Sequence, residues 1–217
     1  MNKIKLIFVG EGAVGKTSLI SQYVDNKFNE EYVMTVGRDK ATKDLEINGK
    51  AIKLEIWDTP GQEKFNQVNK IFMKNTKIAI IVYSIIDKQS FHQLKKWIDM
   101  VKEINKNEDV TIGIVANKSD LFESAEVTKE EGEKFAKEKN ILFFETSAKD
   151  YKSIEKAFIG ICTFHMEKIG KNEIPSTQQI NNGNTVDLKP LEQISDNQFD
   201  DIKIDDKNDC SSKCTII

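Results

Sequence analysis

An eight-residue glycine-rich segment, Gly10–Thr17, constrains this chain more than any other feature. It reads Gly-Glu-Gly-Ala-Val-Gly-Lys-Thr and fits the pattern G-x-x-x-x-G-K-S/T. The apolar run before it, Ile4–Val9, is typical of a buried strand, and a helical stretch is expected after it. In such a turn the glycines let backbone N–H groups surround a phosphate, where the start of a helix adds a favourable field. The alternative is a plain glycine turn that opens a helix, and the strand–turn–helix context favours phosphate binding.

The side chains of this segment have separable predicted roles. The Lys16 ammonium is expected to reach β and γ phosphates, and the Thr17 hydroxyl is expected to bind Mg²⁺. The segment therefore predicts both a nucleotide phosphate site and a metal ligand. The predicted nucleotide contacts in it and directly after it are Gly12, Ala13, Val14, Gly15, Lys16, Thr17 and Ser18.

Strand-like and helix-like stretches alternate over residues 1–168 and predict an α/β fold. Further apolar β-type runs occupy Ala51–Trp57, Ile78–Tyr83, Thr111–Ala116 and Ile141–Glu145. Because they are apolar on both faces, they suit a mostly parallel sheet covered by helices. Apolar residues spaced by three and four over Phe91–Ile104 and Ile154–Cys162 predict helices. The turn signal Asn48-Gly49 predicts a hairpin, with an antiparallel edge strand near Lys40–Ile47. The fold class expected is a three-layer sandwich of the P-loop NTPase type, with a six-stranded mostly parallel sheet and helices on both faces.

A second motif, Asp58-Thr59-Pro60-Gly61-Gln62, follows the strand that ends at Trp57. Asp58 is expected to hold Mg²⁺ through water, and the Gly61 N–H is expected to contact a γ phosphate. Gln62 is expected to orient an attacking water molecule. Taken alone D-x-x-G is a common turn, and its position after the phosphate loop gives it the catalytic interpretation.

Two polar motifs close the last two predicted strands. Asn117-Lys118-Ser119-Asp120 follows one, and Glu145-Thr146-Ser147-Ala148-Lys149 follows the other. A carboxylate such as Asp120 can accept two hydrogen bonds from guanine, whereas adenine would leave it unpaired. Sites of this kind can discriminate by roughly 10⁴-fold or more. N-K-x-D is weak evidence alone in a chain rich in Lys and Asn, and its order after the other motifs makes coincidence improbable.

These motifs, in this order, resemble the Ras superfamily of small GTPases across residues 1–168. The resemblance implies that Phe28 packs against guanine, that Tyr32 covers the γ phosphate and that Thr35 completes the Mg²⁺ shell. Without it, plain packing would be the better interpretation of Phe28 and Tyr32. It also implies that the Ala148 N–H contacts the guanine carbonyl. The base contacts that it implies are Asn117, Lys118, Asp120, Leu121, Ser147, Ala148 and Lys149.

Within the superfamily, residues 53–65 are most similar to the Rab pattern. The chain resembles a divergent member, since Lys40 stands where Rabs usually have an aromatic residue. Pro60 stands where alanine is usual, and Ser84 replaces a common aspartate. The resemblance implies guanine nucleotide and Mg²⁺ as cofactors. It implies as partners an exchange factor, an activating protein, effectors, a prenyltransferase and a chaperone like the GDP-dissociation inhibitors.

Residues 169–217 are predicted to form a disordered tail with a lipid-attachment signal. From Lys171 onward the chain has five lysines and nine acidic residues, and few large apolar residues that could offset the entropy of ordering. The last four residues, from Cys214 to Ile217, form a C-a-a-X end that predicts prenylation of Cys214. A single lipid gives marginal membrane binding and no polybasic stretch is present, so Cys210 is the predicted second anchor. The location expected is the cytoplasmic face of an intracellular membrane, in exchange with the cytosol.

Composition argues against several other classes of protein. The net charge of −3 and the pI near 5.6 give no sign of nucleic-acid binding. Three cysteines, two of them in the last eight residues, form no disulfide framework, and no signal peptide or membrane span is expected. Cys162 is expected in the core, and neither His92 nor His165 receives a role. The function expected is a GTP-hydrolysing switch in Rab-like vesicle trafficking; a Ras-like signalling GTPase at the plasma membrane and a nucleotide-bound scaffold with little turnover remain alternatives.

Overall fold

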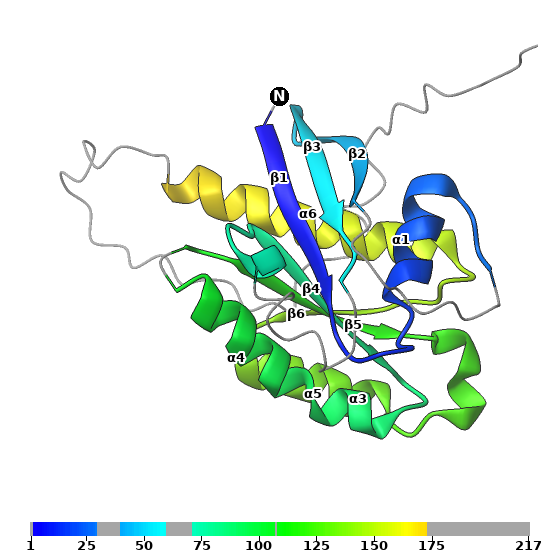
Figure 1. The fold of residues 1–217 in the computed structure, drawn as a ribbon. Helices are drawn as coiled ribbons and strands as arrows, with labels where there is room; N and C mark the ends of the chain where they lie inside the picture. Colours follow the sequence, from blue (N-terminus) through cyan, green and yellow to red (C-terminus); the bar gives the residue numbers. More distant parts are fainter. Residues whose placement is uncertain (1, 30–39, 60–70, 107, 173–217) are drawn as a thin grey trace, which may run out of the picture.

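The computed structural model describes residues 2–29, 40–59, 71–106 and 108–172 (Figure 1). Within these ranges the strands are β1 (Asn2–Val9), β2 (Lys40–Ile47), β3 (Lys50–Trp57), β4 (Ile78–Ser84), β5 (Thr111–Asn117) and β6 (Leu142–Glu145). The helices are α1 (Lys16–Asp25), α3 (Lys88–His92), α4 (Leu94–Ile104), the 3₁₀ helix η2 (Ser119–Ser124), α5 (Lys129–Lys139) and α6 (Tyr151–Asn172).

The six strands of the described residues form one sheet in the order β2-β3-β1-β4-β5-β6. All neighbouring pairs are parallel except β2 and β3, which are antiparallel. The hairpin between those two turns at Asn48 and Gly49, whose φ angles of 52° and 72° are both positive. Asn-Gly tolerates such angles, and a turn of this kind matches the twist of the strands that it joins. The predicted fold class, with its single antiparallel edge strand, is confirmed.

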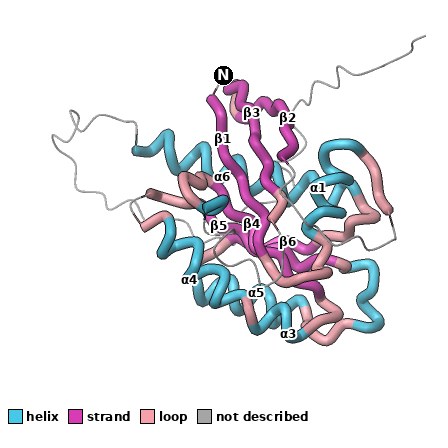
Figure 2. Tube along the Cα trace, in the orientation of Figure 1, coloured by secondary structure: helices cyan, strands magenta, loops and turns pink. Residues whose placement is uncertain are grey.

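Helices cover both faces of the sheet (Figures 1 and 2). On one face α1 and α6 pack against alternate residues of β1, and the ring of Tyr23 stacks on that of Phe158 with centroids 3.8 Å apart. On the other face α3, α4 and α5 enclose a second core that includes Trp97. Cys162 is fully buried on the inner side of α6, as its place in the apolar pattern predicted.

Three helical features differ from the sequence prediction or extend it. The helix predicted over Phe91–Ile104 bends at Gln93, where ψ opens to −8° and separates α3 from α4. Helix α5 was not identified by periodicity, because only Gly132 and Ala136 of it are buried. Helix α6 continues to Asn172, so the predicted domain boundary at residue 168 falls inside it.

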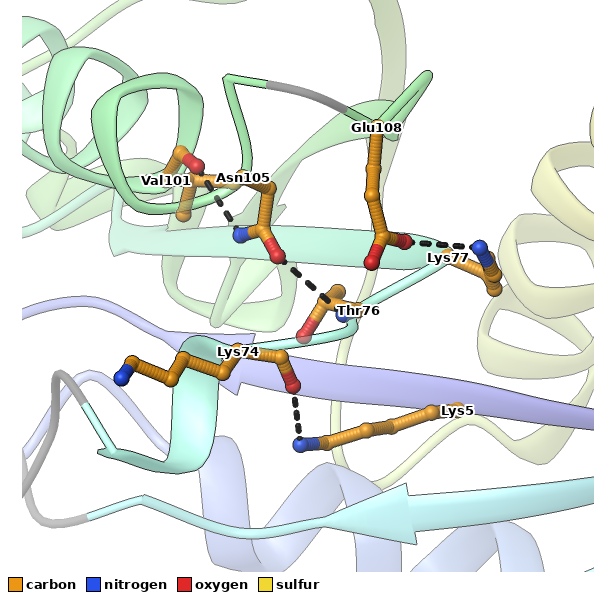
Figure 3. A network of polar contacts seen from close by, with 7 residues as sticks. All are labelled: Lys5, Lys74, Thr76, Lys77, Val101, Asn105 and Glu108. Atoms are coloured by element: carbon orange, nitrogen blue, oxygen red, sulfur yellow. Dashed lines mark hydrogen bonds and ion pairs between the residues drawn. The ribbon is translucent and has the colours of Figure 1, made fainter.

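A set of polar contacts joins the chain segments at the amino ends of β4 and β5 (Figure 3). The buried backbone N–H of Thr76 donates to Asn105 Oδ1 at 3.3 Å, and Lys77 pairs with Glu108 at 2.7 Å. Lys5 Nζ on β1 donates to a backbone carbonyl of the connection before β4 at 2.6 Å. These contacts lie at the opposite end of the parallel strands from the glycine-rich loop.

Candidate functional site

The parallel strands bring the sequence motifs to one edge of the sheet. The glycine-rich loop follows β1, Asp58 follows β3, Asn117 ends β5 and Ser147 follows β6. Because these strands all run in the same direction, their carboxyl ends lie together, which is where α/β sheets bind ligands. The structure therefore places the predicted phosphate, metal and base motifs side by side.

The backbone of the glycine-rich loop has a conformation that its sequence explains. Gly10 has φ of 144°, and a Cβ added there would lie 2.2 Å from the Val82 carbonyl oxygen. Gly15 has φ of 95°, and a Cβ there would lie 2.4 Å from the Asn117 side-chain nitrogen. Ala13 also has a positive φ, of 59°. Glycine removes both clashes, so the loop lies tightly against β4 and β5 and turns directly into α1.

Lys16 begins α1 with its side chain buried, at 6% relative exposure. Its Nζ donates to the backbone carbonyls of Gly10 at 2.9 Å and Glu11 at 2.7 Å. Burial lowers the pKa of Lys16 to about 8, while Asp58 and Glu11 act against that change. A buried ammonium group whose hydrogen bonds within the described residues go to loop carbonyls suits a phosphate anion, which would stabilise its charge. Ser18, on the first turn of α1, is half-buried beside it.

Thr17 and Asp58 form the pair of predicted metal ligands. Thr17 Oγ1 donates to Asp58 Oδ2 at 2.5 Å, and Asp58 is buried at 2% exposure. Among the described residues no group of three or more His, Cys, Asp or Glu could hold a metal ion. A hydroxyl and a carboxylate fit Mg²⁺, which keeps several waters and commonly binds through one or two protein oxygens plus substrate phosphates. The donor set therefore fits Mg²⁺ held together with phosphate.

Asn117 lies between the base motif and the phosphate loop. Its Nδ2 donates to the Val14 carbonyl at 2.8 Å, and its Oδ1 accepts from Thr146 Oγ1 at 3.2 Å. The side chain is 1% exposed, so both hydrogen bonds are made in a dry environment. This amide holds the two motifs in fixed relative positions.

The predicted base pocket is built around Asp120. Ser147 Oγ donates to Asp120 Oδ1 at 2.7 Å, and Lys149 Nζ lies 3.8 Å from Asp120 Oδ2. The same Lys149 nitrogen lies 5.7 Å from the centre of the Phe28 ring, which is 38% exposed. A carboxylate with fixed orientation can accept hydrogen bonds from the edge of a base. The exposed aromatic ring beside it can stack on the face of the same base.

The other predicted base contacts belong to the same two motifs as Asp120 and Ser147. Lys118 adopts a left-handed φ of 65° as the residue before η2, and Ala148 is 8% exposed. Leu121 is 40% exposed on η2. The Ser119 N–H donates to the Thr146 carbonyl at 3.0 Å, so the two base motifs lie side by side.

Several predicted residues lie outside the described ranges. They are Tyr32, Thr35, Pro60, Gly61, Gln62, Cys210 and Cys214. Their assigned roles stay predictions.

Two polar residues were missed by the sequence reasoning. Thr59 is 1% exposed, and its Oγ1 donates to the Phe8 carbonyl at 2.5 Å, which ties the segment after Asp58 to β1. Thr146 orients Asn117 through the bond given above. Both are threonines inside recognised motifs, and a hydroxyl next to a motif ligand in a buried segment is the signal that could have identified them.

Comparison with known proteins agrees with this geometry. A model of the Ras family matches residues 5–168. A relative, the Ras-related protein Rab-11B of Dictyostelium discoideum, is 41% identical over 180 residues, which cover 83% of this chain and 81% of the relative. No helix among the described residues has the length and apolar character needed to cross a bilayer. The phosphate loop, the base pocket and these two matches together show that the chain belongs to the Ras family of small GTPases and is Rab-like.

Proposed function

We propose that this protein is a switch that binds GTP and GDP together with Mg²⁺ and hydrolyses GTP. The observation that supports this most directly is the Asn117 side chain, which fixes the base pocket to the phosphate loop by its hydrogen bond to Val14. A ligand that fills both must carry a base and phosphates in one molecule. Asp120, oriented by Ser147, gives the pocket its preference for guanine, because its carboxylate accepts from the guanine ring N–H and amino group.

In the proposed reaction, the loop backbone and Lys16 bind the phosphates and stabilise the charge that develops on them. Mg²⁺, held by Thr17, Asp58 and Thr35, would supply further neutralisation of that charge when bound. Gln62 orients the attacking water, and the Gly61 N–H contacts the γ phosphate. Loss of that phosphate releases Thr35 and Gly61, which changes the surface that partners bind.

Efficient turnover needs an arginine from another protein. Arg38 is the only arginine in the sequence, and none lies in the phosphate loop. A cationic group that neutralises transition-state charge is worth about 10³- to 10⁵-fold in rate in related enzymes. We therefore expect slow hydrolysis by the isolated protein and stimulation by an activating protein.

The biological role proposed is regulation of vesicle trafficking at an intracellular membrane, as in a Rab-like protein. The similarity to a Rab-11B protein and the C-a-a-X end at Cys214 support it. Lipids on Cys214 and Cys210 would anchor the protein. A prenyltransferase would attach the prenyl group, and a GDP-dissociation-inhibitor-like chaperone would carry the lipidated protein. An exchange factor and effectors complete the partners proposed.

The test of nucleotide choice uses the full chain and compares the affinity for GDP with that for ADP. Asp120→Asn removes the carboxylate and is expected to abolish the preference for GDP. Glu123→Gln, on the exposed side of the same 3₁₀ helix, is the matched control and should retain it. If the parent protein binds ADP as tightly as GDP, the proposed function is wrong.

The test of turnover is single-turnover GTP hydrolysis with and without Mg²⁺, beside Gln62→Leu. Slow, Mg²⁺-dependent hydrolysis that the variant lacks supports the switch. Tight GTP binding without any hydrolysis would instead support a nucleotide-bound scaffold. A plasma-membrane location of the prenylated protein in cells would favour the signalling alternative.

A further inference from the structure

The Trp97 side chain makes a hydrogen bond to the phosphate loop, although Trp97 is not among the residues predicted to contact nucleotide. The indole lies on α4 at 1% exposure, inside the core between that helix and the sheet. Its Nε1–H donates to Glu11 Oε1 at 3.0 Å, across 86 residues of sequence. Glu11 is the second residue of the phosphate loop, so this bond joins α4 directly to that loop.

The backbone carbonyl of Glu11 also accepts a hydrogen bond, from Lys16. While its side chain accepts from Trp97, its backbone carbonyl accepts from Lys16 Nζ at 2.7 Å. A shift of the Glu11 backbone would therefore move the carbonyl that receives the lysine. Glu11 thus couples the position of α4 to the position of the phosphate-binding ammonium group.

The loop has an anchor in its second half that is independent of this one. There the Val14 carbonyl is held by the Asn117 side chain at 2.8 Å. In the first half Gly10 lies against the β4 backbone, and the contact that holds the next residue by its side chain is the one from Trp97. The two halves of the loop are therefore fixed by different elements, β5 on one side and α4 on the other.

We propose that Trp97 and Glu11 are positioning residues for the phosphate site: their hydrogen bond holds the first half of the phosphate loop in the conformation that retains nucleotide. The proposal rests on the guanine-nucleotide function proposed above. It differs from a purely structural explanation, in which the bond only satisfies the buried indole N–H. A structural role would affect the stability of the domain and leave nucleotide release unchanged.

The experiment measures release of a fluorescent GDP analogue from the full chain, with thermal unfolding measured on the same samples. Trp97→Phe keeps a buried aromatic ring and removes the N–H donor. Glu11→Ala removes the acceptor at a half-buried position and leaves the buried indole N–H unpaired, so some loss of stability is expected beside the change in release. Each is expected to release nucleotide about five- to tenfold faster than the parent, because a hydrogen bond to a charged group is lost.

Two further variants separate positioning from packing. Ile98→Val, the neighbouring buried residue of α4, removes a methylene and no hydrogen bond, and should lower stability without faster release. Glu11→Gln retains a side-chain oxygen that can accept from Trp97 and should restore much of the retention lost in Glu11→Ala. The double variant Trp97→Phe/Glu11→Ala should release no faster than the faster single variant, since both remove the same bond.

The outcomes are distinguishable. Release within about twofold of the parent in both single variants would overturn the inference and leave the proposed function intact. Additive acceleration in the double variant would also overturn it, because the two residues would then act separately. Failure of the parent protein to bind GDP would refute the proposed function itself. If Trp97→Phe does not fold, the Glu11 variants alone decide the outcome.

Discussion

The buried ammonium of Lys16 predicts that nucleotide binding takes up a proton. Burial lowers the pKa of this lysine to about 8, against 10.5 for an ordinary lysine. Phosphates beside the ammonium favour its charged form and raise that pKa again. Those free molecules whose Lys16 is neutral must therefore gain a proton when nucleotide binds.

The size of the effect follows from the pKa. At pH 8 about half of the free molecules have a neutral Lys16, so about 0.5 proton is taken up per nucleotide, against about 0.1 at pH 7. The sign is fixed by the direction of the change: affinity is constant well below pH 8 and falls as pH rises through it. Above pH 8 the decrease approaches about tenfold per pH unit.

The assay is titration calorimetry of nucleotide-free protein with GDP at pH 8, in two buffers of different ionisation enthalpy. The heats should differ by about half of the difference between those enthalpies. Lys16→Arg is the control, because its guanidinium stays charged at this pH and the difference should disappear. Equal heats in the two buffers for the parent protein would refute the reasoning.

Three shorter predictions concern stability and retention. Burial, with Lys168 and Lys77 nearby, lowers the pKa of His165 to about 4. As the pH falls, this histidine is therefore protonated in the unfolded chain before it is protonated in the folded one. The free energy of unfolding should therefore fall by up to about 3 kcal/mol from pH 6.5 to pH 4 in urea titrations, and His165→Gln should lack this loss. Gly10→Ala, which would place a Cβ against the β4 backbone, should lower the free energy of unfolding by more than about 2 kcal/mol in thermal melts, whereas Gly170→Ala should not lower it. Thr146→Val should speed GDP release about three- to tenfold, and Thr163→Val, whose hydroxyl has no hydrogen-bond partner in the described part of the chain, should leave release unchanged.

The sequence predicted β4 and β5 well because their burial on both faces leaves continuous apolar runs. The run at Ile78–Tyr83 and the Asn48-Gly49 turn each identify an element within a residue or two of the bounds observed. Helix α5 has no such run, since its surface is mostly charged and exposed. Its capping box, in which Thr128 and Glu131 bond each other's backbone N–H, was the available signal.

In the candidate site, too, some residues could be predicted from the sequence and others could not. Residues predicted to meet the ligand belong to motifs with fixed spacing, so the sequence could propose Lys16 and Asp120, and the structure places both at the carboxyl ends of the parallel strands. Of the residues that position them, Thr146 and Ser147 lie inside the motifs, whereas Trp97 is distant in the chain and carries no local pattern. The bond between Trp97 and Glu11 links positions 86 residues apart, and the tryptophan alone reads as an ordinary core residue of an amphipathic helix. Only the packing of α4 beside the loop reveals it.

The contacts of Figure 3 join β1, the connection before β4, α4 and the loop before β5, and none of them includes a residue of the phosphate loop or the base pocket. Release of the nucleotide would therefore break none of the hydrogen bonds or ion pairs at this end of the sheet. In hydrogen–deuterium exchange we expect the Thr76 amide to stay protected in the empty protein while amides of the phosphate loop exchange quickly. We therefore expect a partner that captures the empty protein to stabilise the nucleotide-binding half, while the other half keeps the contacts of Figure 3.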